Sequence, residues 1–379
     1  MNCAQIQITY TQFLISYKHY VDNSVKTNNR RKVFIMETVC KNVDSNVNSQ
    51  TNYTQAVDIL NAGEVVAFPT ETVYGLGAVA TNDTAVKKIF EAKGRPSDNP
   101  LIVHIGTKEE VELYIEHISE VAKKCIDLFW PGPLTLVMPV KPNVLANSVT
   151  AGLATVGIRM PDHPVALALL RQLKKPLAAP SANRSGKPSP TEAIHVQDDL
   201  GGYIPYILDG GSTGIGLEST VLDVTHEPPV ILRPGGITRE MLEAKIGPVI
   251  QPTKIEQKLE ATPKAPGMKY THYAPNAPVL LIECDLEKVH EAVHQLQKQG
   301  HKVALLAPAS FEDIEADFYF SIGEVGSKEE MGATLYHALR ACDKTAATII
   351  LATTTSTEGV GAAIMNRLEK AAGGKWYTP

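Results

Sequence analysis

Short apolar runs alternate with stretches of helical periodicity between residues 53 and 246. The run 65–68 is typical of a buried strand, and the residues from Pro164 to Leu173 have the spacing of a helix. Hairpin-like and crossover connections are mixed, which predicts a twisted, mixed α/β sheet rather than a purely parallel one. Further strands are expected at 101–105, 134–140, 156–159, 177–179, 221–224 and 230–233, and helices at 83–90 and 111–129.

We place this first domain at 53–247, and the pattern of apolar and polar residues changes on both sides of it. Residues 248–275 carry prolines and charges without a clear period and indicate a linker. Regular β-α-β alternation over 276–379 then predicts a smaller Rossmann-like domain, although it lacks the G-x-G-x-x-G turn of a dinucleotide site. Residues 1–50 are Asn-rich, without sustained periodicity, and are expected to be poorly ordered.

Met36 is a plausible alternative start of the chain, in which case residues 1–35 are dispensable. The alternative is a targeting or partner-binding arm. The N-terminus does not have the pattern of a signal peptide, and no apolar run is long enough for a bilayer, so we expect a cytoplasmic protein that does not contact membranes.

Composition and motifs argue against several classes of protein. The net charge is −5, whereas a domain whose main role is to hold nucleic acid is usually basic. The five cysteines are scattered and form no C-x-x-C pair, which argues against a disulfide framework or a cysteine zinc site. No phosphate-binding loop, G-x-S-x-G or H-E-x-x-H motif occurs, so any catalysis is expected to depend on positioning and charge neutralisation.

Polar residues gather in loops at the predicted strand ends. Lys93, Arg95 and Asn99 share one loop after the glycine-punctuated segment 68–77, with His104 just beyond. Two cations and an amide suit phosphate oxygens, although a solvated basic turn has the same composition. Arg159 ends an apolar strand, four residues after Thr155, and indicates either a bound carboxylate or an internal salt bridge.

Two later loops add neutral donors and further cations. The segment 178–189 is rich in small residues that let a ligand approach the backbone. The segment 216–221 precedes a predicted strand, and 233–236 follows beyond it. Four such segments at strand ends can converge on one concave, basic mouth. The candidate ligand-binding residues of these two segments and of the strand end beyond them are Ser181, Asn183, Lys187, Ser189, Ser219, Thr220 and Arg233.

Taken together, these motifs closely resemble the threonylcarbamoyl-AMP synthase family in its long form, a YrdC-like catalytic domain followed by a Rossmann-like domain. The resemblance covers roughly residues 53–379 and includes Lys93-x-Arg95 with Ser181-x-Asn183, the signature quartet of the family. The other matching stretches are 69–77, 216–220, 233–235, 266–275 and 359–367.

The resemblance implies an L-threonylcarbamoyladenylate synthase, a nucleotidyltransferase that condenses L-threonine, bicarbonate and ATP and releases pyrophosphate. It implies Lys93, Arg95, Ser181 and Asn183 as catalytic residues. By the same resemblance, L-threonine is held by Thr72, His104, Arg159, Ala179 and Ser219. ATP is held by Arg95, Asn99, Thr155, Ser181, Ser189, Arg233, His272 and Tyr273, with 271–273 folding over the nucleotide as a lid.

The resemblance also implies partners. Mg²⁺ is expected to arrive with ATP, because the key loops hold few carboxylates, and no organic cofactor is expected. Downstream proteins would transfer the threonylcarbamoyl group to the adenosine beside the anticodon of tRNA, with at most weak direct tRNA contact. Two alternatives remain open: a double-stranded-RNA-binding protein, and a regulatory relative with the same fold.

Overall fold

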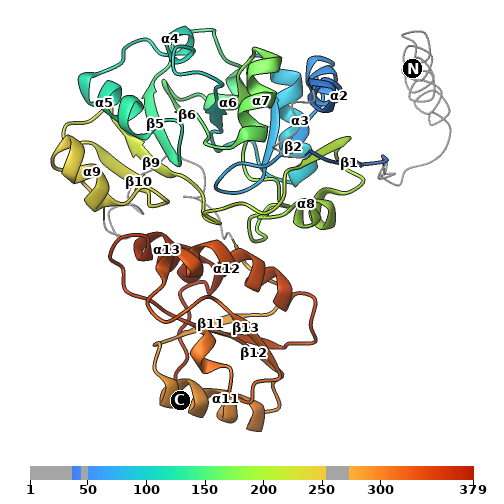
Figure 1. Cartoon of the computed structure of the whole chain (residues 1–379), viewed down its shortest axis with the longest axis vertical. Coiled ribbons are helices and arrows are strands. Elements are labelled where there is room, and N and C mark those ends of the chain that lie inside the picture. The colour runs from blue at the N-terminus through green and yellow to red at the C-terminus, as the bar shows by residue number, and fades with distance from the viewer. Residues whose placement is uncertain (1–35, 44–49, 253–272) are drawn as a thin grey trace. The chain divides into compact units, whose positions relative to one another are not determined.

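The computed structural model describes residues 36–43, 50–252 and 273–379. The first domain contains a ten-stranded mixed sheet, as the sequence predicts (Figure 1). In sheet order, the strands are β1 (Val39–Asn42), β8 (Tyr206–Asp209), β2 (Val66–Phe68), β3 (Gly75–Val79), β7 (Leu177–Ala178), β4 (Ile102–His104), β6 (Thr155–Arg159), β5 (Leu134–Pro139), β9 (Thr220–Asp223) and β10 (Val230–Arg233).

The direction of the central strands places the polar loops at one edge. β4 runs parallel to β6, and the register pairs His104 with Arg159, the last residue of each strand. β7 lies antiparallel to both β3 and β4, with Val103 and Ala78 flanking Ala178. The sheet therefore brings the ends of β4 and β6 together, the kind of edge at which α/β proteins bind ligands.

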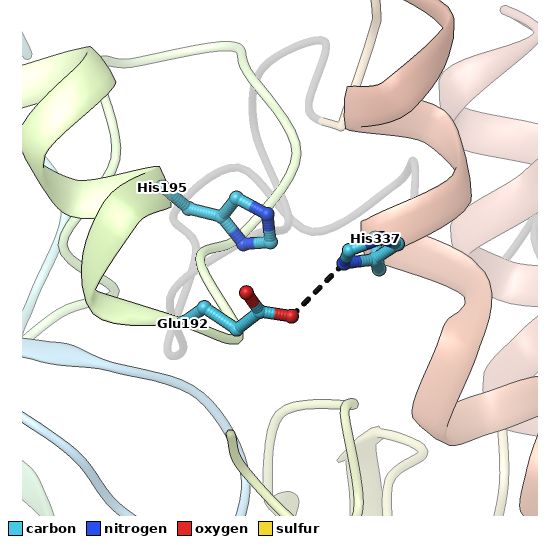
Figure 2. Close-up of side chains that lie close together, drawn as sticks. All are labelled: Glu192, His195 and His337. Carbon is cyan, nitrogen blue, oxygen red and sulfur yellow. Dashed lines mark hydrogen bonds and ion pairs between the residues drawn. The ribbon is translucent and has the colours of Figure 1, made fainter. Parts of the chain in front are cut away.

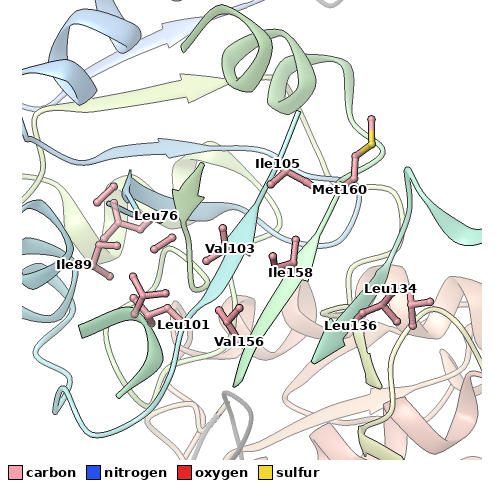
Figure 3. Close-up of a cluster of buried hydrophobic side chains, with 14 of the residues drawn as sticks. Leu76, Ile89, Leu101, Val103, Ile105, Leu134, Leu136, Val156, Ile158 and Met160 are labelled. Carbon is pink, nitrogen blue, oxygen red and sulfur yellow. The ribbon is translucent and has the colours of Figure 1, made fainter. Parts of the chain in front are cut away.

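Both faces of this sheet are buried. Val66 and Phe68 face a cluster with α2 (Gln50–Asn61) and α7 (Pro164–Leu173), whereas Ala67 between them faces the opposite cluster. Alternation of this kind follows from the period of two in a strand. The second cluster, with α3 (Asp83–Lys93), is the largest core of the domain (Figure 3). Asn82 caps α3 through its side chain, which accepts a hydrogen bond from the backbone N–H of Ala85.

The structure corrects several sequence-based expectations. Val39–Asn42 forms β1 beside β8, although residues 1–50 were expected to be poorly ordered. The expected helix at 111–129 is two helices, α4 (Val111–Tyr114) and α5 (Glu120–Phe129), because Ser119 caps a new helix after the chain becomes extended at Ile115. The remaining helices of this domain are α6 (Asn147–Thr150), α8 (Ala193–Leu200) and α9 (Arg239–Ile246).

The glycine-punctuated segment 68–77 has the composition of a turn, yet its last three residues, 75–77, begin the buried strand β3. A Cβ added at Gly77 would lie 2.8 Å from the ring of Phe68, so only glycine fits beside that ring. Small residues make this strand look turn-like in the sequence.

The second domain has the Rossmann-like form that the sequence predicts. Its four strands are all parallel, in the order β11 (Val279–Ile282), β14 (Ile349–Thr353), β12 (Val303–Ala307) and β13 (Phe318–Ser321). One core includes α11 (Leu286–Lys298) and the short 3-10 helix η1 (Ala309–Phe311). The other includes α12 (Lys328–Cys342) and α13 (Gly361–Ala371), together with Val73 and Leu217 of the first domain.

Within the described residues, no helix is both long enough and apolar enough to cross a bilayer.

Candidate functional site

A pocket with about 640 Å³ of empty space lies where the central strands end. Ten of the sequence-predicted site residues line it: Thr72, Arg95, His104, Arg159, Ala179, Ser181, Asn183, Ser219, Arg233 and Tyr273. The remaining lining residues are Thr70, Val73, Gly75, Ile102, Pro180 and Glu218.

Arg159 is the fixed cation of this pocket. Its Nη2 lies 2.6 Å from Glu71 Oε2, its Nη1 donates to Thr72 Oγ1 at 2.9 Å, and its Nε donates to the carbonyl of Gly132 at 3.2 Å. Thr72 is held in turn by Thr70, with 2.8 Å between the two hydroxyl oxygens. Arg159 therefore forms an internal salt bridge with Glu71 and also lines the pocket. These contacts orient its guanidinium before any ligand binds.

His104 stands next to this cation as a neutral imidazole. Burial, reinforced by the positive charge of Arg159, lowers the pKa of His104 to about 3. Nδ1 of its ring is buried and has no hydrogen-bond partner among the described residues. A neutral ring with an open nitrogen beside Arg159 suits a polar, non-ionic group of a ligand.

The depressed pKa of His104 predicts a pH-dependent stability. The unfolded state binds a proton near the ordinary pKa of 6.5, and the folded state does so only near 3. Stability from this residue is therefore present above about pH 6.5 and is lost as the pH falls, at up to about 1.4 kcal/mol per pH unit. Urea unfolding of the wild type and of His104→Asn at pH 7, 6 and 5 measures it. We expect the variant to lose less stability on acidification, and equal slopes would contradict this account.

The Ser181 loop forms the opposite wall and is braced by Lys93. The ammonium of Lys93 is fully buried and donates to the carbonyls of Ser181 and Asn183. Ser181 Oγ donates to Asn183 Oδ1 at 2.6 Å. Burial, together with the charge of Arg95, lowers the pKa of Lys93 well below its usual value. Lys93 does not line the pocket in this structure; it shapes the loop that does.

Ser219 and Arg233 form the third wall. Arg233 Nη2 donates to the carbonyl of Ser219 at 2.9 Å and to its hydroxyl at 3.2 Å. The hydroxyl of Ser219 lies 2.8 Å from that of Thr135 on β5. The loop before β9 is thereby tied to the end of β10.

Glu218 connects this wall to the second domain. Its carboxylate accepts hydrogen bonds from Arg367 Nε at 3.0 Å, from the hydroxyl of Tyr336 at 3.0 Å and from the hydroxyl of Ser189. Burial opposes the ionisation of Glu218, but the charges of Arg367 and Arg233 outweigh it and lower the pKa to about 2. The carboxylate therefore stays charged, with partners from two domains.

Tyr273 closes the same corner. It is buried, its backbone has a φ of +67°, and its ring centre lies 5.2 Å from that of Tyr336. The guanidinium of Arg367 lies 5.9 Å from the ring centre. The other lid residues, Thr271 and His272, lie outside the described residues.

Three further predicted residues do not line the pocket. Asn99 is fully buried, and its side-chain amide has no hydrogen-bond partner among the described residues. Thr155 begins β6, at the end of the strand opposite Arg159. Ser189 is buried and donates a hydrogen bond to Glu218.

The sequence analysis missed the roles of Glu71 and Glu218, although both lie in motifs that it quoted.

Comparison with known proteins gives two family matches. The model of the Sua5, YciO and YrdC proteins, described as "Telomere recombination", matches residues 58–235. The model described as "Threonylcarbamoyl-AMP synthase, C-terminal domain" matches residues 237–373. The two matches follow one another along the chain and correspond to the two sheets.

Individual relatives agree with these matches. A threonylcarbamoyl-AMP synthase of Bacillus subtilis is 53% identical over 85% of this chain and 93% of its own. One of Schizosaccharomyces pombe is 42% identical over 84% and 87%, respectively. The crystal structure of Pyrococcus abyssi Sua5 complexed with L-threonine superposes with a TM-score of 0.84 at 45% identity, over 89% of this chain and 98% of that protein.

Proposed function

The chain belongs to the threonylcarbamoyl-AMP synthase family, and on this premise we propose that it condenses L-threonine, bicarbonate and ATP to threonylcarbamoyl-adenylate with release of pyrophosphate. It would then act as a nucleotidyltransferase that supplies the modification of tRNA adenosine next to the anticodon. The observation that carries the proposal is one pocket that Arg159 and His104 line together with Arg95 and Arg233.

The two halves of the pocket suit two ligands. Arg159, with Thr72 and neutral His104 beside it, matches the carboxylate and hydroxyl of an amino acid. Arg95, Ser181, Asn183 and Arg233 offer cations and neutral donors for phosphates. A carbamate formed on the threonine amine would attack the α-phosphorus of ATP directly, so no protein nucleophile is needed.

We propose that Mg²⁺ enters with ATP. Among the described residues that line the pocket, Glu218 is the one carboxylate, and Arg367, Tyr336 and Ser189 already engage its oxygens. The donors that remain are hydroxyls and amides, so nucleotide phosphates would supply most ligands of a hard cation. The ion would neutralise phosphate charge, while Arg95 and Arg233 orient the chain of phosphates.

Two variants test the nucleotide half of the pocket. Arg95→Ala and Ser181→Ala are each expected to lower threonine-dependent pyrophosphate release by at least about 100-fold, because each removes a polar group that lines the nucleotide half of the pocket, where phosphate charge would develop. The measurement is a coupled pyrophosphate assay, with circular dichroism to show that both variants fold. Full activity in both variants would refute the site.

The alternatives predict different results. A double-stranded-RNA-binding protein would show no threonine-dependent pyrophosphate release, and a regulatory relative would accept another substrate. The pairing of Arg159 with Thr72 and His104 in one pocket favours the synthase. The downstream transfer proteins and a weak tRNA contact remain part of the proposal, to be tested by reconstituted tRNA modification.

A further inference from the structure

A group of metal-ligating side chains lies outside the pocket, between the two domains. Glu192 and His195 come from the start of α8, and His337 comes from the middle of α12 (Figure 2). One donor atom from each lies within 4.8 Å of the other two. None of the three lines the substrate pocket.

The sequence explains why these atoms meet. Glu192 and His195 are three residues apart, which places them on one side of the first turn of α8. Two ion pairs fix α8 further along, one to α12 and one just beyond its end: Asp199 with Arg340 at 2.7 Å, and Asp198 with Lys344 at 3.0 Å. The buried Asp199–Arg340 pair and the Lys344 pair set the register that brings His337 opposite Glu192.

We propose that Glu192, His195 and His337 form a binding site for a divalent first-row metal ion of the Zn²⁺ type, which joins the catalytic domain to the C-terminal domain. Two imidazoles and a carboxylate are a common ligand set for Zn²⁺, with a fourth position left for water.

The distances require only small movements. Three atoms within 4.8 Å of one another lie within about 2.8 Å of a common point, whereas zinc bonds to nitrogen and oxygen are about 2.0–2.2 Å long. The side chain of His337 is 56% exposed and that of Glu192 is 32% exposed, so both can close on an ion held by buried His195. Glu192 and His337 already approach to 3.0 Å.

The surroundings of His195 also bear on the proposed site. The backbone N–H of Thr191 donates to His195 Nδ1 at 3.3 Å, and Thr191 Oγ1 lies 3.4 Å from the same nitrogen. An ion on Nε2 requires the tautomer with its proton on Nδ1, for which Thr191 Oγ1 is the acceptor at hand. Asp199 and Asp198 offset the neighbouring cations Arg340 and Lys344.

The test is a titration of untagged, chelator-treated full-length protein with Co²⁺, followed by visible absorption, and with Zn²⁺, followed by calorimetry. We expect one ion per chain, and at least about tenfold weaker binding in His337→Ala and in Glu192→Gln. Zn²⁺ should raise the midpoint of thermal unfolding of the wild type but not of His337→Ala.

His294→Ala is the matched control, because exposed His290 and His294 lie one turn apart on α11 and can chelate a metal by themselves. The proposed ion should still bind this variant. Wild-type affinity in His337→Ala, or binding abolished by His294→Ala alone, would overturn the proposal. Protein without an ion at the proposed site should still release pyrophosphate when ATP is supplied with Mg²⁺. Failure of the metal site is thereby distinguished from failure of the proposed function.

Discussion

Replacing Arg159 with lysine is expected to lower kcat/KM for L-threonine by about 100-fold while ATP affinity changes by less than about twofold. The guanidinium holds Glu71, Thr72 and the Gly132 carbonyl at 2.6, 2.9 and 3.2 Å, and a single ammonium cannot keep all three and also face a carboxylate. Lysine preserves the charge, so Glu71 is not left without a cation.

Steady-state pyrophosphate kinetics against threonine, with calorimetric ATP titration, give both quantities. Arg239→Lys is the control, because Arg239 is half exposed and pairs only with Glu243 among the ion pairs of the described residues. An unchanged kcat/KM in Arg159→Lys would show that the amino acid binds elsewhere.

The second large effect is expected from Arg367→Met, a change in the C-terminal domain. It leaves the buried carboxylate of Glu218 without its main cation, at a cost of about 3–5 kcal/mol in unfolding free energy. Turnover should also fall at least about tenfold, because Ser219 and Arg233 are positioned next to that carboxylate. Thermal unfolding and pyrophosphate release measure the two losses.

The double variant Glu218→Gln/Arg367→Met distinguishes pairing from simple loss of packing. Because the unpaired charge is gone, it should be more stable than Arg367→Met alone, and the double-mutant cycle gives the coupling.

The pH dependence of stability tests the same ion pair in a second way. In the wild type, the stabilisation by Glu218 is present above about pH 4.5 and is lost as the pH falls toward 2. In Arg367→Met, stability should begin to fall at a higher pH. Additive changes in unfolding free energy in the double-mutant cycle, with no shift in the pH at which Arg367→Met loses stability, would contradict the coupling.

The sequence predicted most of the strands whose apolar runs are bounded by clear polar ends, because burial on both faces leaves that mark, but it missed β8, which has a run of the same kind. It missed β3, since a glycine-rich strand beside Phe68 has the composition of a turn. It also missed β1, whose residues are mostly exposed and whose order depends on pairing with β8, far along the chain.

The site was also predicted only in part from the sequence. The motifs located the residues that line the pocket, because polar groups at strand ends converge when the strands are neighbours. They could not show that Lys93 faces the carbonyls of Ser181 and Asn183, or that Arg367 reaches Glu218. Those contacts join residues 88 or more positions apart, and no local pattern encodes them.

The most direct test of the proposed reaction is to identify its product. The chain is incubated with ATP, L-threonine and ¹³C-labelled bicarbonate, and the nucleotides are analysed by mass spectrometry. We expect threonylcarbamoyl-adenylate that carries the label, in amounts equal to the pyrophosphate released, and none when threonine is omitted. Pyrophosphate release without a labelled adenylate, or the same yield with any amino acid, would contradict the proposed function.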